Sequence, residues 1–263
     1  MEKYVLGVDT AWSKNNPSGI ILLKWTHNSK PELVRAGRSY DEFCNNGRPI
    51  WGNRVEGSMP IFSKIIECCR RKIDLIALDI PLSPQGITGR READDAISRE
   101  YGNRKVSAHS PSRNRSGILA EIIFNQLTEN GFSWANEYIK TPAFIEVYPH
   151  VAIIELFDCK ERFQYKVRKT TNYWPNISLN ERLNNIISNL NILRNKIASV
   201  VSGIEEILPQ LNSNGSYTIN CLKGYEDLLD AVLSAMVGCN YLDNKAIPKP
   251  LGDQTGAIWV PKN

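Results

Sequence analysis

Short apolar runs separated by polar loops open the chain. Residues 4–8 and 20–25 are apolar and β-prone, as is typical of strands buried on both faces, and a weaker run near Glu32–Ala36 predicts a third strand. The short connections between these three strands favour an antiparallel meander. A helical pattern over Met59–Lys72 follows, and then another apolar run over Ile73–Leu78. The opening of the chain therefore predicts three antiparallel strands, a helix and a fourth strand.

The rest of the chain alternates helical patterns with fewer strands. Its predicted elements are a polar, turn-rich segment (Pro81–Ser116), a helix (Gly117–Asn130), a strand (Ala143–Tyr148), one or two helices interrupted around Ser202-Gly203 (Leu179–Leu208), a helix (Gly224–Asn240) and a possible closing strand (Ala257–Val260). The sequence contains no internal repeat and no low-complexity linker. We therefore predict one α/β domain over residues 1–263, with a mixed sheet flanked by helices and insertions at about 80–116 and 157–222.

Composition narrows the class of protein. The 263 residues are 42% hydrophobic and 23% charged, and a chain of this length can bury a core without a disulfide or metal staple. The six cysteines form no CxxC pair, which favours reduced thiols over a zinc knuckle or a disulfide scaffold. The formal charge of +4 is only mildly basic, so it does not by itself identify a nucleic-acid-binding protein.

Membrane and export signals are the next feature to consider. Every apolar run is shorter than a membrane span, and the N-terminus leads directly into a predicted strand rather than into a signal peptide. We therefore expect a cytoplasmic protein with no membrane contact.

Two aspartates follow predicted buried strands directly. Asp9 comes after residues 4–8, and Asp79 comes after Ile73–Leu78. The carboxyl ends of parallel strands meet at one edge of an α/β sheet, where ligand sites usually form. Two like charges there would raise each other's pKa unless a cation lies between them, and Mg²⁺ prefers such oxygen ligands. The alternative is that each aspartate caps a loop or helix, and Pro81 and Ser83 would also suit an Asx-type turn at Asp79.

A second acidic pair lies in the late helix. Asp227 and Asp230 are three residues apart and therefore share one helix face. The small residues Ala231, Ser234 and Gly238 flank this acidic stripe and would permit close approach to the sheet. The alternatives are a solvated helix face, or a negative first turn that complements the helix dipole.

These acids carry a family resemblance. Gly7-Val8-Asp9, Ala77-Leu78-Asp79 and the Asp227–Ala231 helix resemble the acid sets of RNase H-like nucleases, and the DxxDA helix is similar to that of Holliday-junction resolvases. The predicted strand-strand-strand-helix-strand order is also that of the RNase H-like fold. More closely, the chain resembles the predicted RNase H-like nucleases of domain-of-unknown-function family 429. Further motifs that carry this resemblance are Asp79-Ile80-Pro81-Leu82, Glu146-Val147-Tyr148-Pro149, Tyr165-Lys166, Asp230-Ala231 and Gly252-Asp253 through Trp259-Val260-Pro261.

The resemblance implies a site and an activity. Asp9, Asp79, Asp227 and Asp230 would hold one or two Mg²⁺ or Mn²⁺ ions, and Glu146 is an additional catalytic candidate. Asp79 and Glu146 compete for a role that resolvases give to one acid, and Glu146 has the alternative of pairing with a nearby arginine or lysine. Such a metal centre would hydrolyse phosphodiester bonds of DNA or RNA, because the ions clamp the attacking and leaving oxygens.

Two other functions fit the same fold. An actin-like ATPase or kinase also begins with a Gly-Val-Asp strand, but it normally needs glycine-rich phosphate loops. The segment after Asp79 offers no such glycine, and the segment after Asp9 contains the bulky Trp12. A catalytically silent nucleic-acid-binding module is the other alternative.

Two basic segments are candidates for contact with nucleic acid. Residues 99–115 and 160–169 are rich in arginine and lysine, and aromatic residues are interleaved in the second. Basic groups attract backbone phosphates and aromatic rings stack on unpaired bases, although charge runs are also common on solvated surfaces. The candidates are Arg113, Arg115, Tyr165, Lys166, Arg168 and Lys169. Of the histidines, His109 is a candidate for proton transfer, and His150 is expected to cap the next helix.

Overall fold

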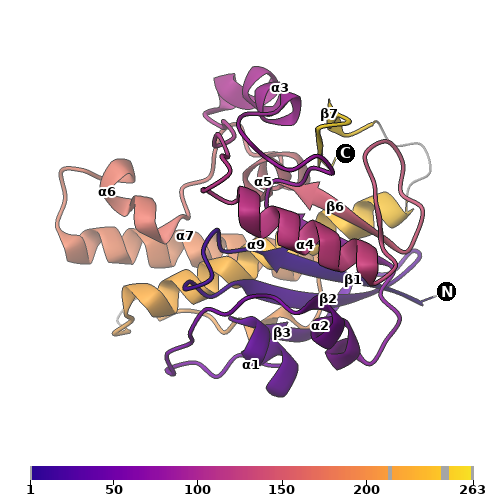
Figure 1. The fold of residues 1–263 in the computed structure, drawn as a ribbon. Coiled ribbons are helices and arrows are strands. Elements are labelled where there is room, and N and C mark those ends of the chain that lie inside the picture. Colours follow the sequence, from indigo (N-terminus) through magenta and orange to yellow (C-terminus); the bar gives the residue numbers. More distant parts are fainter. Residues whose placement is uncertain (1, 213–214, 244–248, 262–263) are drawn as a thin grey trace.

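The computed structural model describes residues 2–212, 215–243 and 249–261. Over these residues the strands form one eight-stranded sheet with the order β3-β2-β1-β4-β6-β8-β7, and β5 pairs with β6 (Figure 1). The strands are β1 (Glu2–Asp9), β2 (Gly19–Thr26), β3 (Glu32–Gly37), β4 (Leu75–Asp79), β5 (Ser133–Trp134), β6 (Ala143–Val147), β7 (Leu251–Asp253) and β8 (Gly256–Trp259).

The sheet is mixed in the predicted way. β1, β2 and β3 pair antiparallel, while β1, β4, β6 and β8 pair parallel in succession. β7 returns antiparallel to β8 at the far edge. The central strands are apolar on both faces because helices cover both faces. The predicted α/β class, with three antiparallel strands followed by parallel strands as in an RNase H-like fold, is confirmed.

Helices form a layer on each face of the sheet (Figure 1). On one face, α9, α7 and α5 pack against a core that includes Val5, Leu75 and Ala77. On the other face, α1, α2 and α4 pack against Leu6 and Val8. The α-helices are α1 (Tyr40–Asn45), α2 (Phe62–Cys69), α3 (Glu92–Tyr101), α4 (Gly117–Glu129), α5 (Pro149–Leu156), α6 (Thr170–Tyr173), α7 (Leu179–Val200), α8 (Ile204–Ile207) and α9 (Ile219–Asp243), with 3-10 turns at Gly102–Arg104 and Val167–Lys169.

Glycines let α9 approach the sheet closely. A Cβ atom on Gly7 of β1 would lie 2.1 Å from the backbone oxygen of Ala231, and one on Gly19 of β2 would lie 2.2 Å from that of Asp227. On the helix side, a Cβ on Gly238 would lie 2.8 Å from Val5. The close approach expected from the small residues of this helix is therefore confirmed, and it fixes the height of α9 above β1 and β2.

The structure adds elements that the sequence pattern does not reveal. The segment predicted as polar and turn-rich contains α3, whose buried apolar side chains, Ala93, Ile97 and Tyr101, cover only a narrow stripe. The glycine- and asparagine-rich loop after β3 contains α1, which Ser39 caps by accepting from the backbone N–H of Glu42. In both places a short helix is stabilised by capping and tertiary contacts rather than by a wide apolar face.

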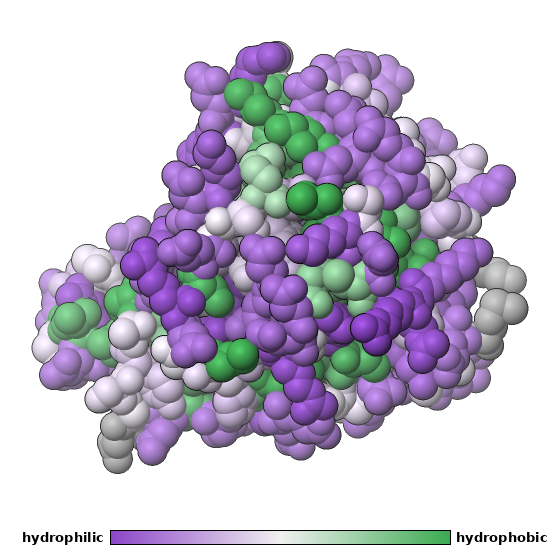
Figure 2. Space-filling view, turned by 60° about the horizontal axis from the view of Figure 1, so that its bottom comes forward, coloured by the Kyte–Doolittle hydropathy of each residue, from purple (hydrophilic) through white to green (hydrophobic). Residues whose placement is uncertain are grey.

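Hydrophilic residues predominate on the face drawn in Figure 2, and the hydrophobic residues there lie in small groups between them. The largest exposed hydrophobic side chains come from many different elements, among them Ile61, Tyr138 and Leu179. Over the described residues, no helix combines the length and apolar character that a membrane crossing requires.

Candidate metal centre

Asp9 and Asp79 lie side by side at the carboxyl ends of adjacent parallel strands. Their Cα atoms are register partners in the β1–β4 pair. Side chains alternate between the faces of a strand, so Asp9 shares a face with Val5 and Gly7, and Asp79 shares one with Leu75 and Ala77. That face is the one covered by α9. Both aspartates therefore project toward the helix that carries the second acidic pair.

The helix α9 completes the cluster. One carboxylate oxygen from each of Asp9, Asp227 and Asp230 can be chosen so that all three lie within 4.8 Å of one another. Asp227 is 4% exposed and Asp230 is fully buried. The alternative of a solvated helix face is therefore wrong for this pair. We call Asp9, Asp79, Asp227 and Asp230 the acid cluster.

Two lysines and a tyrosine contact the acid cluster. Lys223 forms an ion pair with Asp227, and Lys166 forms one with Asp230. The Tyr165 hydroxyl donates to Asp230 Oδ1 at 2.5 Å. The sequence placed Lys166 and Tyr165 among the nucleic-acid contacts. Instead, the Tyr165 ring is fully buried, which leaves no exposed surface for base stacking, and Lys166 is committed to carboxylates.

Glu226 is a site residue that the sequence reasoning missed. It is 1% exposed, accepts a hydrogen bond from the backbone N–H of Val167 at 2.5 Å, and lies 3.0 Å from Lys223 Nζ and 3.4 Å from Lys166 Nζ. Its position next to Asp227 in the helix was the available signal. Through these contacts Glu226 holds the segment that carries Lys166 against α9, and so it helps to position Lys166 beside Asp230.

Burial and like charge shift the proton affinities of the cluster. Burial, followed by the charge of Asp227, raises the pKa of Asp9 to about 8. Burial raises the pKa of Asp230 to about 7 in spite of the neighbouring Lys166, and burial and Asp9 raise the pKa of Asp79 well above its usual value. Although burial alone would lower it, the pKa of Lys166 is raised well above its ordinary value by Asp230 and other neighbours, so this lysine stays charged. The lysines only partly compensate the carboxylates, and a divalent cation would compensate them further.

Glu146 lies in a different environment. It follows Phe144 by two residues on β6, so its side chain points to the face of the sheet opposite α9. There Arg91 Nη2 and Nη1 donate to its two oxygens at 2.6 and 2.7 Å, and the backbone N–H of Leu82 donates at 2.7 Å. Glu146 thus takes the alternative of pairing with an arginine. In the β4–β6 pair, Glu146 is the register partner of Leu78, which also faces away from α9. Glu146 and the acid cluster therefore lie on opposite faces of the sheet.

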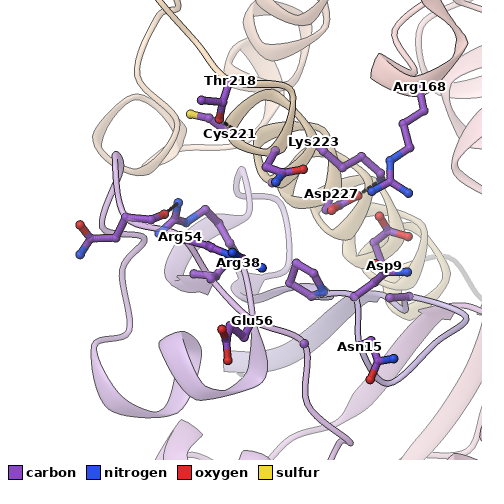
Figure 3. A pocket seen from close by; sticks show the side chains of 18 of the residues that line it. Asp9, Asn15, Arg38, Arg54, Glu56, Arg168, Thr218, Cys221, Lys223 and Asp227 are labelled. Atoms are coloured by element: carbon purple, nitrogen blue, oxygen red, sulfur yellow. Dashed lines mark hydrogen bonds and ion pairs between the residues drawn. The ribbon is translucent and has the colours of Figure 1, made fainter.

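A cleft of about 800 Å³ opens beside the acid cluster. Asp9, Asp79 and Asp227 line it, together with the loop after β1, residues 52–57 and the start of α9. Figure 3 shows Arg168, from the 3-10 turn before α6, extending toward Asp227 and Asp9. Arg168 is exposed, and no described residue gives it a hydrogen bond or ion pair. This cleft is lined by three carboxylates and by a guanidinium without a partner among the described residues, so it can receive a metal ion and an anionic group together.

The other predicted basic residues lie outside the acid cluster. Arg113 and Arg115 are exposed, and the Arg115 guanidinium lies over the Trp12 ring, 5.1 Å from its centroid. Lys169 is partly buried in the 3-10 turn before α6. His150 does not cap α5, because Tyr148 occupies the N-cap. His150 is instead buried in the first turn, with Nε2 at 2.8 Å from Arg162 Nη2.

Comparisons with known proteins give one family. The chain matches no curated protein and no solved structure. A family model described as "Protein of unknown function (DUF429)" matches residues 7–251.

Proposed function

The chain belongs to the DUF429 family of proteins of unknown function, and from its geometry we propose that it is a divalent-metal-dependent nuclease of the RNase H-like type. It would hydrolyse phosphodiester bonds of DNA or RNA. One observation carries the proposal: carboxylates of Asp9, Asp227 and Asp230 gather within 4.8 Å, and Asp9 and Asp227 open into the cleft.

The donor set suits Mg²⁺ or Mn²⁺. All the candidate ligands are carboxylate oxygens, which hard divalent cations prefer over nitrogen or sulfur. Asp9, Asp227 and Asp230 would hold the ion, because one oxygen of each lies within 4.8 Å of the others, and Asp79 would reach it from the lining of the same cleft. Asp230 already accepts hydrogen bonds from Tyr165 and Lys166 on its two oxygens, so its position is fixed before an ion arrives. The raised pKa values of Asp9 and Asp230 also indicate carboxylates that lack a full counter-charge.

The chemistry divides between the ion and the chain. A bound divalent cation would polarise the phosphate and lower the pKa of a bound water. Arg168 would bind a non-bridging phosphate oxygen, because its guanidinium extends into the cleft beside Asp9 (Figure 3). Lys166 and Tyr165 would hold Asp230 in place as charge develops, and the loops around the cleft would limit access of bulk water. In-line displacement at phosphorus needs little covalent chemistry from the protein beyond this positioned charge.

Nucleotide hydrolysis is a second candidate. The cleft volume of about 800 Å³ lies in the range of small-ligand pockets. However, the loop after β1 lines this cleft with Trp12, Asn15, Asn16 and Pro17, whereas a phosphate-binding loop of an ATPase relies on glycines. The nuclease proposal is therefore the better supported of the two.

The test is a cleavage assay on the purified chain. Single-stranded DNA, duplex DNA, RNA, a four-way junction and ATP are each incubated with Mn²⁺, with Mg²⁺ or with EDTA. We expect metal-dependent cleavage of at least one polynucleotide, which Asp9→Asn abolishes. The matched control is Asp253→Asn, since Asp253 is exposed on the edge strand β7. Release of phosphate from ATP alone would favour the second candidate, and nucleic-acid binding without cleavage would indicate a silent module.

A further inference from the structure

The aromatic ring of Trp12 lines the cleft next to Asp9. It lies three residues after Asp9 and is partly exposed. The Arg115 guanidinium lies 5.1 Å from its ring centroid, and the His109 ring meets it edge-on at 6.3 Å. An accessible indole can stack on an unpaired base, and an arginine beside it can attract the strand's phosphates.

Positive charge lies directly against Trp12. Arg115, in the loop before α4, is exposed, and its guanidinium lies over the Trp12 ring. Burial and, next, Arg115 lower the pKa of His109, whose ring meets Trp12 edge-on, in agreement with this placement of the charge. Arg168 lines the same cleft as Trp12. The aromatic ring therefore has an exposed cation against it and a second one in the cleft that it lines.

The shape of the cleft limits what can reach the acid cluster. Asp227 and Asp230 are 4% and 0% exposed, so a reacting phosphate has to enter the cleft rather than rest on an open surface. A cleft of about 800 Å³ is comparable to a small-ligand pocket, so it admits a short piece of a strand.

We infer that the nucleic acid enters this site as an unpaired strand, with one base stacked on Trp12 and an adjacent phosphate held by Arg115. The next phosphodiester along the strand then lies over Asp9 and Asp227, within reach of Arg168. This inference rests on the proposed nuclease function and names its substrate class: single-stranded DNA or RNA, or a duplex end that has opened.

Binding without metal tests the inference directly. Fluorescently labelled short single strands of DNA and RNA, and duplexes of the same sequences, are titrated with the chain in EDTA, and anisotropy is measured. We expect at least one single strand to bind about tenfold tighter than its duplex. Trp12→Ala should weaken that binding by about tenfold, the size expected for one stacked base, and Trp12→Phe should restore most of it.

Arg115 has a matched control within the same loop. Arg113 and Arg115 are both exposed and two residues apart, but only Arg115 lies over Trp12. Arg115→Ala should reduce the slope of log affinity against log salt by about 0.7, the value for one phosphate contact on a single strand, and Arg113→Ala should leave it unchanged. The same titrations with DNA and with RNA show which of the two nucleic acids the site prefers.

The outcomes that overturn the inference are distinct from those that overturn the function. Duplexes bound as tightly as single strands, a Trp12→Ala variant that binds like the wild type, or no binding of nucleic acid would each refute the unpaired-strand inference. The nuclease chemistry is judged separately by Mn²⁺ binding in calorimetry and by Mn²⁺-dependent hydrolysis of bis(para-nitrophenyl) phosphate, a small diester that needs no stacking.

Discussion

Two groups of buried carboxylates lie near the carboxyl ends of neighbouring parallel strands, on opposite faces of the sheet. The acid cluster faces α9, whereas Glu146 faces the other way and forms a network with Arg91 and Asp94. Arg91 lies 2.6 Å from Glu146 and 2.8 Å from Asp94, and all three side chains are almost fully buried. Both groups therefore remove carboxylates from water, but they differ in how the charge is compensated.

The difference lies in the geometry of the cation. The planar guanidinium of Arg91 donates to both oxygens of Glu146, which leaves this carboxylate satisfied. In the acid cluster, the point charges of Lys166 and Lys223 each reach only some of the carboxylates. A carboxylate bound by an arginine on both oxygens serves the fold, whereas an undercompensated cluster next to a cleft is available to a ligand.

The largest expected effect is on metal-dependent hydrolysis, which should depend on the acid cluster and not on Glu146. Asp9→Asn should lower the proposed Mn²⁺-dependent hydrolysis by about a thousandfold, because the ligand charge that holds the ion and its activated water is lost. Glu146→Gln should retain Mn²⁺ affinity in the folded protein, measured by calorimetry. A Glu146 variant that loses the ion while it stays folded would contradict the assignment of Glu146 to the fold.

The next effect is on the free energy of unfolding, to which the Arg91 network should contribute. Arg91→Ala leaves Glu146 and Asp94 buried without their counter-charge, and removal of one partner from such a pair costs about 3–5 kcal/mol. The free energy of unfolding from urea titration measures the loss. Arg99→Ala is the matched control, because the Arg99–Glu92 pair is exposed and such pairs contribute about 0–1 kcal/mol. Equal losses in the two variants would mean that the Arg91 network is not structural.

Much of this contrast could be predicted from the sequence, and the reason is periodicity. The apolar runs before Asp9 and Asp79 located β1 and β4, and the acidic pair at Asp227 and Asp230 marks the face of α9 that lies against Asp9. Glu146 also ends an apolar run, so the sequence grouped it with the others. Only the register of β6 shows that it points to the other face.

The partners of the cluster were beyond the reach of local patterns. Lys166 and Tyr165 lie in the part of the insertion that precedes its predicted helices and has no regular periodicity, and their basic and aromatic character suggested nucleic-acid contact instead. Their approach to Asp230 depends on how that insertion folds back onto α9, where Glu226 accepts from the Val167 backbone. Long-range contacts of this kind are determined by tertiary packing rather than by spacing in the sequence.

A backbone substitution should disturb one group and spare the other. A methyl group on Gly7 would lie 2.1 Å from the Ala231 backbone oxygen, so Gly7→Ala has to push α9 away from β1. We expect a loss of about 1–3 kcal/mol and weaker Mn²⁺ binding, because Asp227 and Asp230 move with the helix. Gly102→Ala is the control, since a methyl there has no atom within 4 Å and the backbone is helical. Unfolding titrations and calorimetry on both variants measure the difference. Unchanged Mn²⁺ affinity in Gly7→Ala would show that the cluster tolerates movement of α9.

The last prediction concerns pH, and its sign follows from the raised pKa values. Asp9 has a folded-state pKa of about 8 against an ordinary value of 3.8, so the metal-free folded state binds a proton more tightly than the unfolded chain does. The stability contributed by that proton is fully present below about pH 4 and is lost as pH rises through about 8. Each tenfold difference in proton affinity corresponds to about 1.4 kcal/mol, or a few degrees in Tm for a chain of this size.

Thermal unfolding in EDTA between pH 5 and pH 8.5 measures this dependence, over the upper part of the window set by the Asp9 pKa. We expect Tm to fall as pH rises, and excess Mn²⁺ to reduce the fall because the ion replaces the proton as the compensating charge. Asp9→Asn should flatten the metal-free profile more than Glu146→Gln does, because burial also raises the pKa of Glu146 but Arg91 opposes that shift. A wild-type Tm that stays level across this range, or one that rises, would mean that Lys166 and Lys223 already neutralise the acid cluster, and the contrast with the Arg91 network would disappear.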